Sequence, residues 1–104
     1  MSSELIVKEE IYSDYVKVTL IGEIDIYTAQ TLKDKLYSIV ETNQTDLKLE
    51  CSDLNYIDST GLGIFVGALK KTRLYGKNIY LNKLKDNIRK LFVITGLDKL
   101  FIIE

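Results

Sequence analysis

Histidine is absent from the 104-residue sequence, and cysteine occurs only once. Without histidine the chain lacks the usual base that activates a serine or cysteine nucleophile, and it lacks the commonest ligand of transition metals. The lone Cys51 cannot form an internal disulfide, and it follows Leu47 and Leu49 at alternate positions, as expected of a small buried thiol. These absences argue against most hydrolases, and we expect neither a metal site nor a cofactor.

Long apolar runs are also missing. No run approaches the ~20 residues needed to cross a bilayer, and the first residues lack the basic and apolar regions of a secretion signal. We therefore expect a cytoplasmic protein that does not bind membranes. The fourteen Lys and Arg residues are spread along the chain, and the net charge is −1 with a pI near 5.5, which disfavours nucleic-acid binding.

The length and composition fit one compact domain over residues 1–104. Hydrophobic residues make up 46% of the chain and charged residues 28%, as in ordinary globular proteins. The spacing of the apolar residues changes several times along the chain. It predicts strands at residues 5–11, 15–23, 46–51, 77–81 and 101–103, and helices from Thr28 to before Asn43, from about residue 59 to Gly76, and from about residue 88 to Gly96.

The predicted order of elements is β-β-α-β-α-β-α-β. Strands separated by helices of this length favour parallel pairing through right-handed crossovers, and the opening hairpin adds an antiparallel strand. The sequence thus predicts an α/β fold with a mixed, mostly parallel sheet of four to five strands and an antiparallel N-terminal edge strand. Because two strands alternate cleanly between apolar and polar residues, we expect the helices mainly on one face of the sheet.

The most informative segment is residues 53–63, DLNYIDSTGLG, which we predict to form the turn between the third strand and the second helix. Asp58 or Ser59 can cap that helix by accepting a hydrogen bond from its first turn. A helix N-terminus carries roughly +0.5 elementary charge, so a phosphate on Ser59 would be tolerated there. Gly61, Gly63 and Gly67 lower helix stability, and we interpret them as leaving room for the close approach of a partner.

The residues alone leave other interpretations of Ser59 open. Ser59 can be only a helix cap, with the glycines easing the packing of the helix on the sheet. A catalytic serine would need a base, and Lys70 and Lys71 lie about three turns along the same helix, too far to activate it. The phosphate-binding pattern G-x-x-x-x-G-K-[ST] does not occur.

Three segments resemble the anti-sigma factor antagonists of the bacterial STAS-domain family. Residues 58–67, DSTGLGIFVG, are similar to the family's phosphorylation motif, and residues 22–29, GEIDIYTA, to its signature before the first helix. Residues 88–97, IRKLFVITGL, are similar to its C-terminal helix. The sequence of the first segment is most similar to the branch that controls sigma-B, the general stress sigma factor. The chain has Gln30 where the family often has proline, a change that should be nearly neutral early in a helix.

The resemblance implies a partner switch in which this chain is a substrate and a ligand, not an enzyme. An anti-sigma factor that is also an ATP-dependent serine kinase would bind either a sigma factor or this chain. Phosphorylation of the serine that matches Ser59 would release the chain, and a PP2C-type phosphatase would reset it. Thr60 is a less favoured acceptor. The predicted partner-binding residues are Asp25, Tyr27, Thr28, Tyr56, Asp58, Ser59, Thr60, Gly61 and Gly63.

Two alternatives remain at this stage. The chain can be a STAS scaffold, or a nucleotide- or lipid-binding module, of another regulatory or transporter-associated complex. It can also be an enzyme that uses Ser59 as a nucleophile with a base supplied from elsewhere.

Overall fold

The computed structural model describes residues 3–104. Within them the elements follow the predicted order, with one short 3-10 helix in addition. They are β1 (Leu5–Ile11), β2 (Tyr15–Ile24), α1 (Ala29–Asn43), β3 (Asp46–Ile57), α2 (Ser59–Leu74), β4 (Ile79–Asn82), α3 (Asp86–Ile94), η1 (Leu97–Lys99) and β5 (Ile102–Ile103). No helix of this described part is long and apolar enough to cross a membrane.

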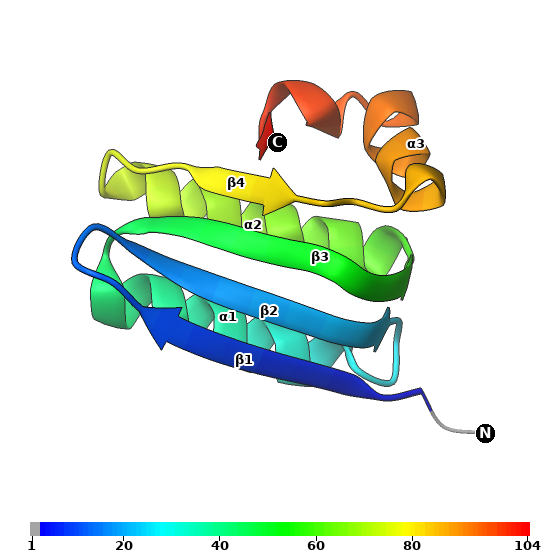
Figure 1. The fold of residues 1–104 in the computed structure, drawn as a ribbon, viewed down its shortest axis with the longest axis horizontal. Helices are drawn as coiled ribbons and strands as arrows, with labels where there is room; N and C mark the ends of the chain where they lie inside the picture. Colours follow the sequence, from blue (N-terminus) through cyan, green and yellow to red (C-terminus); the bar gives the residue numbers. More distant parts are fainter. Residues whose placement is uncertain (1–2) are drawn as a thin grey trace.

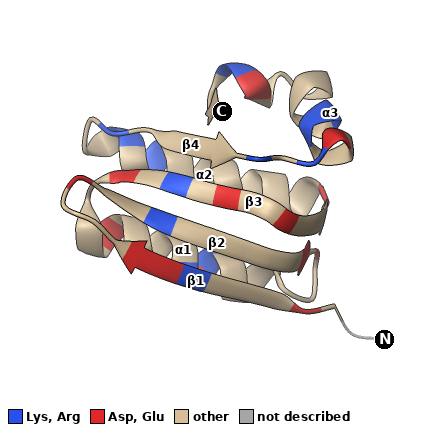
Figure 2. Ribbon diagram, viewed as in Figure 1, with Lys and Arg blue, Asp and Glu red and all other residues tan. Residues whose placement is uncertain are grey.

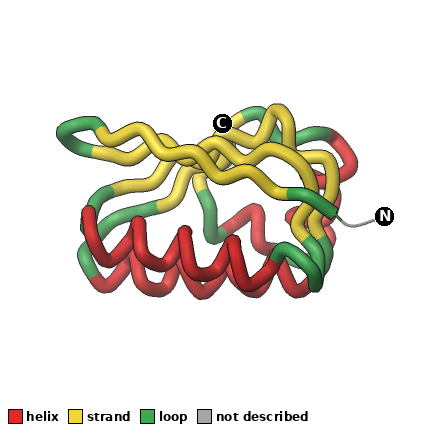
Figure 3. The backbone as a smooth tube through the Cα atoms, turned by 90° about the horizontal axis from the view of Figure 1, so that it is seen from below, coloured by secondary structure: helices red, strands yellow, loops and turns green. Residues whose placement is uncertain are grey.

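The five strands form one sheet in the order β1-β2-β3-β4-β5 (Figure 1). β1 pairs antiparallel with β2, and the other neighbouring strands are parallel. The helices α1 and α2 lie side by side on one face of the sheet, while the opposite face is left uncovered by helices (Figure 3). The predicted mixed sheet, with an antiparallel N-terminal edge strand and helices mainly on one face, is confirmed.

The core lies between the sheet and the two long helices. The strand residues that alternate toward the helices are fully buried, among them Val18, Leu20 and Leu49. Cys51 belongs to the same row and is also fully buried, as predicted. A second group of aromatic rings attaches the C-terminal part: the Phe92 centroid lies 6.2 Å from that of Phe65 on α2 and 5.7 Å from that of Phe101.

The third strand is longer than the sequence predicted. Alternation stops at Cys51, yet β3 continues to Ile57. The pairing with β2 shifts register twice, between Thr19 and Ile21 and between Gly22 and Glu23. These irregularities change which β3 residues face the helices, because an extra residue in one strand reverses the two-residue period. The turn predicted over residues 53–63 is therefore wrong: residues 53–57 belong to β3, residues 59–63 belong to α2, and only Asp58 separates the two elements.

The helix ends differ slightly from the prediction. Thr28 occupies the N-cap position of α1, but its side chain makes no capping hydrogen bond. Asn43 is the last residue of that helix, and Gln44 after it has a left-handed backbone with φ of 55°. Gly96 follows α3 with φ of +75°, a conformation that glycine adopts without strain, so it closes the helix as predicted.

Candidate functional site

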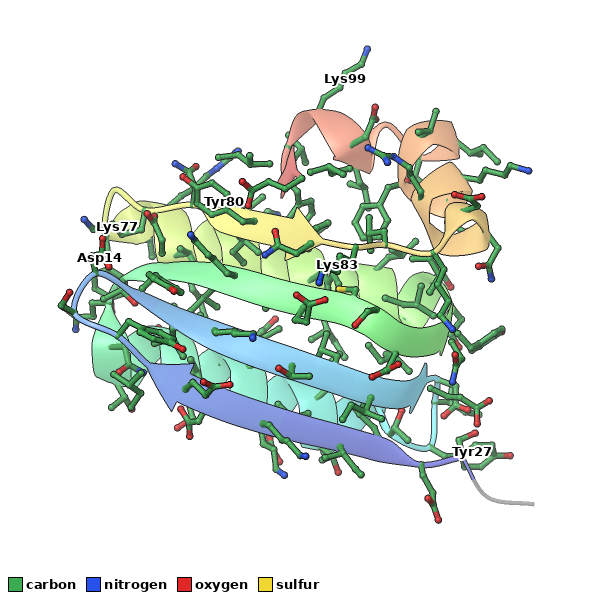
Figure 4. All side chains as sticks on the ribbon, in the orientation of Figure 1. Asp14, Tyr27, Lys77, Tyr80, Lys83 and Lys99 are labelled. Carbon is green, nitrogen blue, oxygen red and sulfur yellow. The ribbon has the colours of Figure 1, made fainter. Side chains whose placement is uncertain are left out.

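The carboxyl ends of β2 and β3 lie next to each other at one end of the sheet. Ile24 pairs with Ile57 in the last rung of the parallel ladder. Both strands therefore end at the same edge of the sheet. The backbone N–H of Asp58, just after β3, donates to the carbonyl oxygen of Ile24 at 3.2 Å. The loop after β2 and the start of α2 are thereby joined, although more than thirty residues separate them in the sequence. In Figure 4 this end of the molecule carries Tyr27, opposite the end that carries Asp14 and Lys77.

Asp58 is the residue that caps α2. Its backbone is extended, with φ of −109° and ψ of −175°, and its Oδ1 accepts a hydrogen bond from the backbone N–H of Gly61 at 3.2 Å. Capping by a side-chain oxygen satisfies one of the free N–H groups of the first turn. Ser59 is then the first helical residue, and both Ser59 and Thr60 are exposed. The Ser59 hydroxyl thus lies on the surface at the positive end of a 16-residue helix.

Asp25 organises the neighbouring loop. Its Oδ1 accepts hydrogen bonds from the backbone N–H groups of Tyr27 at 2.8 Å and Thr28 at 3.2 Å, and its Oδ2 accepts one from the Ser3 hydroxyl. The hydrogen bond from Ser3, together with those from Tyr27 and Thr28, lowers the pKa of Asp25 below its ordinary value, because these donors stabilise the carboxylate. Asp25 is therefore a carboxylate at neutral pH.

Thr28 holds this loop from inside. Its side chain is 6% exposed, its hydroxyl donates to the carbonyl oxygen of Glu23 at 2.9 Å, and its Oγ1 accepts the backbone N–H of Asp25 at 3.0 Å. A buried side chain with these internal bonds offers little surface to a partner. Of the residues that the sequence suggested for partner contact, Thr28 is better assigned to positioning Asp25.

Three large side chains at this end are exposed to solvent. Tyr27 is 77% exposed and Tyr56 48% exposed, as the surface contact suggested for them requires. Ile26 is 68% exposed and was missed by the sequence analysis. The only signal for it was an isoleucine between Asp25 and Tyr27, after the apolar alternation of β2 has ended. Exposed aromatic and aliphatic side chains of this size are typical anchors of protein interfaces.

The glycines of α2 do not share one role. A Cβ on Gly61 would lie 2.5 Å from Ile24 Cγ2 and 2.7 Å from Ile57 Cγ1, and a Cβ on Gly67 would collide with the Tyr37 hydroxyl. Both glycines therefore let α2 pack closely on this chain's own residues, and the interpretation that they open the helix to a partner is wrong. Only Gly63 faces open space, with nothing within 4 Å of a Cβ added there.

The site carries several acidic groups and a serine without a base. Glu23, Asp25, Asp53 and Asp58 lie at or beside the carboxyl ends of β2 and β3. In the described part of the chain, Ser59 makes no side-chain hydrogen bond to a base, and no group of three or more Cys, Asp or Glu side chains is arranged to hold a metal ion. The arrangement presents an exposed serine hydroxyl on a surface that carries several carboxylates.

Comparisons with known proteins show which family the chain matches. The model of the STAS domain family matches residues 6–104. An anti-sigma-B factor antagonist of Bacillus subtilis (strain 168) is 42% identical over 82 residues, covering 79% of this chain and 74% of that protein. One from Staphylococcus epidermidis is 37% identical over 89 residues, covering 86% of this chain and 82% of that protein.

Solved structures show the same fold. The anti-sigma factor antagonist SpoIIAA in its unphosphorylated form superposes with a TM-score of 0.82 at 19% identity, covering 95% of this chain and 88% of that one. The phosphorylated form of SpoIIAA from Bacillus superposes with a TM-score of 0.74 at the same identity, covering 95% of this chain and 91% of that one.

Proposed function

Because the chain belongs to the STAS domain family, we propose that it is an anti-sigma factor antagonist of the sigma-B type. In its unphosphorylated form it binds an anti-sigma factor and so releases the sigma factor for transcription. The anti-sigma factor is also an ATP-dependent serine kinase, and phosphorylation of Ser59 ends the binding. A PP2C-type phosphatase restores the unphosphorylated form. These partners meet in the cytoplasm, where transcription takes place.

The observation that carries the proposal is the position of Ser59. Its hydroxyl is exposed on the first residue of α2, and the neighbouring Asp58 and Asp25 are held by hydrogen bonds to the backbone. A kinase can reach such a hydroxyl without unfolding any part of the chain. The Ser59 Oγ bonds to the γ-phosphorus of ATP, ADP leaves, and the hydroxyl proton passes to a base of the kinase, so this chain acts as the substrate.

The effect of the phosphate follows from the charges around it. Phosphorylation adds about −1.5 to −2 charges beside Asp58 and close to Asp25. The N-terminus of α2 partly offsets that charge, so the fold should stay intact while the surface becomes more anionic. At an interface, the added repulsion and the desolvation of the phosphate oppose binding. A loss of ~4 kcal/mol there corresponds to about a thousandfold weaker affinity.

The direct test is to incubate the chain with the anti-sigma kinases of its source organism and ATP, and to map the phosphate by mass spectrometry. We expect one phosphate, on the peptide that contains Ser59, and none on a Ser59→Ala variant. The Thr60→Ala variant is the matched control, because the adjacent Thr60 is also exposed, and this variant should still be phosphorylated. The absence of phosphate with every kinase would contradict the proposal and favour a scaffold role for the STAS domain.

A further inference from the structure

The outward face of α3 combines apolar and basic side chains. Val93 is 56% exposed and Ile94 is 79% exposed, whereas the inward residues Ile88 and Phe92 are fully buried. The outward residues line a hollow of about 310 Å³, and they are Asp86, Arg89, Lys90, Val93 and Ile94. The core is already completed by the inward residues, so folding does not explain two adjacent β-branched side chains in solvent. We call these five residues the α3 surface.

Positive charge is concentrated in this part of the chain, contrary to the even spread expected from the sequence. Residues 70–104 contain nine of the fourteen Lys and Arg residues and three of the fifteen Asp and Glu residues. Residues 1–69 hold the other five basic and twelve acidic residues. Figure 2 shows basic residues on α3 and on the segment that leads into it, with an acidic residue also on α3, and both acidic and basic residues along β1 and β3. The α3 surface carries Arg89 and Lys90 against one carboxylate, Asp86, so it is weakly basic, while the surroundings of Ser59 are acidic.

The α3 surface lies at the same end of the molecule as Ser59. Figure 1 shows α3 beside the turn where β3 gives way to α2. Two contacts fix this position: Lys85 Nζ, at the N-cap of α3, donates to Asn55 Oδ1 of β3 at 2.6 Å, and the Phe92 ring packs on Phe65 of α2. Asn55 precedes Ser59 by four residues. One partner that covers Ser59 can thus extend onto α3.

We propose that the α3 surface is a second docking site for the anti-sigma factor, and that it binds an amphipathic segment bearing acidic residues. This inference rests on the proposed function and adds the chemistry of the partner. Val93 and Ile94 supply apolar contact area, and Arg89 and Lys90 supply charges complementary to carboxylates. The interface then has two halves, one over the Ser59 region and one over α3. Only the first half is changed by phosphorylation.

The test measures binding of the proposed anti-sigma kinase by isothermal titration calorimetry. Arg89→Glu/Lys90→Glu reverses the two charges, and Val93→Ser/Ile94→Ser removes the apolar contacts. Both should weaken binding about tenfold or more, and added salt should weaken the wild type more than the charge-reversed variant. The matched control is Lys70→Glu/Lys77→Glu, which reverses two exposed charges outside this surface and should bind like the wild type. All substituted side chains are exposed, so circular dichroism should report an intact fold.

Other results would overturn the inference. If both α3 variants bind like the wild type while Ser59→Asp does not bind, the docking site is refuted and the proposed function stands. If the Lys70→Glu/Lys77→Glu control loses as much affinity, the effect is one of net charge and not of α3. A further measurement tests the wild type on vesicles of anionic phospholipid. If the wild type binds them and the Arg89→Glu/Lys90→Glu variant does not, while the variant keeps its kinase affinity, α3 is a membrane-binding surface. Equal kinase binding by Ser59→Ala and Ser59→Asp would instead refute the proposed function itself.

Discussion

The carboxylate of Asp58 accepts a hydrogen bond from the backbone N–H of Gly61 at 3.2 Å, and Asp58 is the single residue between the end of β3 and the start of α2. Because the turn is so short, Ser59 lies directly after the end of the sheet. The same Asp58 donates its backbone N–H to Ile24, which holds the start of α2 against the loop of Asp25. The position of the proposed phosphoacceptor is therefore fixed by the backbone on both sides.

The first prediction concerns the switch at Ser59. Ser59→Ala should bind the anti-sigma kinase constitutively, and Ser59→Asp should bind it roughly a thousandfold more weakly, because a fixed negative charge beside Asp58 adds repulsion at the interface and must be desolvated. Calorimetric titration of both variants, with Thr60→Ala as the control, measures the difference. Equal affinities would contradict the switching mechanism.

The second prediction concerns the cap of α2. Asp58→Ala should lower the free energy of unfolding by about 1 kcal/mol, because the N–H of Gly61 loses its partner. Urea unfolding followed by circular dichroism measures this change. Asp53→Ala is the control, since Asp53 is exposed and lies outside the cap, and it should change stability by less than about 0.5 kcal/mol. An equal effect of the two substitutions would refute the assigned cap.

The third prediction separates the glycines of α2. Gly63→Ala should raise the free energy of unfolding by about 0.5 to 1 kcal/mol, because alanine favours the helix and its Cβ enters open space. Gly61→Ala should lower it by about 1 to 3 kcal/mol, because its Cβ would clash with Ile24 and Ile57. Both changes are read from urea unfolding. Shifts in the same direction would contradict the packing described for Gly61.

The fourth prediction concerns Cys51. Burial, and to a smaller extent the nearby charge of Glu50, raises the pKa of the Cys51 thiol from 9.0 to about 12. The unfolded thiol then loses its proton at a lower pH than the folded one, so the folded state binds more protons and stability falls as the pH rises above about 9. Between about pH 8 and about pH 10.5, the free energy of unfolding measured with urea should fall more for the wild type than for Cys51→Ala.

Reactivity of the same thiol gives an independent readout. A thiol reagent should label Cys51 slowly in the native protein and rapidly in denaturant, because the thiolate is the reactive form and the side chain is buried. Rapid labelling of the folded protein would contradict both the burial and the raised pKa.

Much of the fold was determined by the sequence alone. The two-residue alternation of β2 and the helical spacing of α1 are local patterns, and each follows directly from the geometry of the backbone and the need to bury apolar side chains. The same local reasoning placed Asp58 and Ser59 at a helix N-terminus. The absence of histidine removed most catalytic interpretations of Ser59, and three motifs identified the family.

Tertiary structure decided what depends on contacts between distant segments. The full length of β3 depends on two register shifts against β2, which a single strand cannot reveal. The need for glycine at position 61 follows only from the side chains of Ile24 and Ile57, which leave no room for a Cβ. The role of Thr28 follows only from its hydrogen bonds inside the loop. The α3 surface likewise emerged only when folding separated the inward from the outward side chains. Local periodicity specifies the elements, whereas the roles of these residues depend on neighbours that packing brings together.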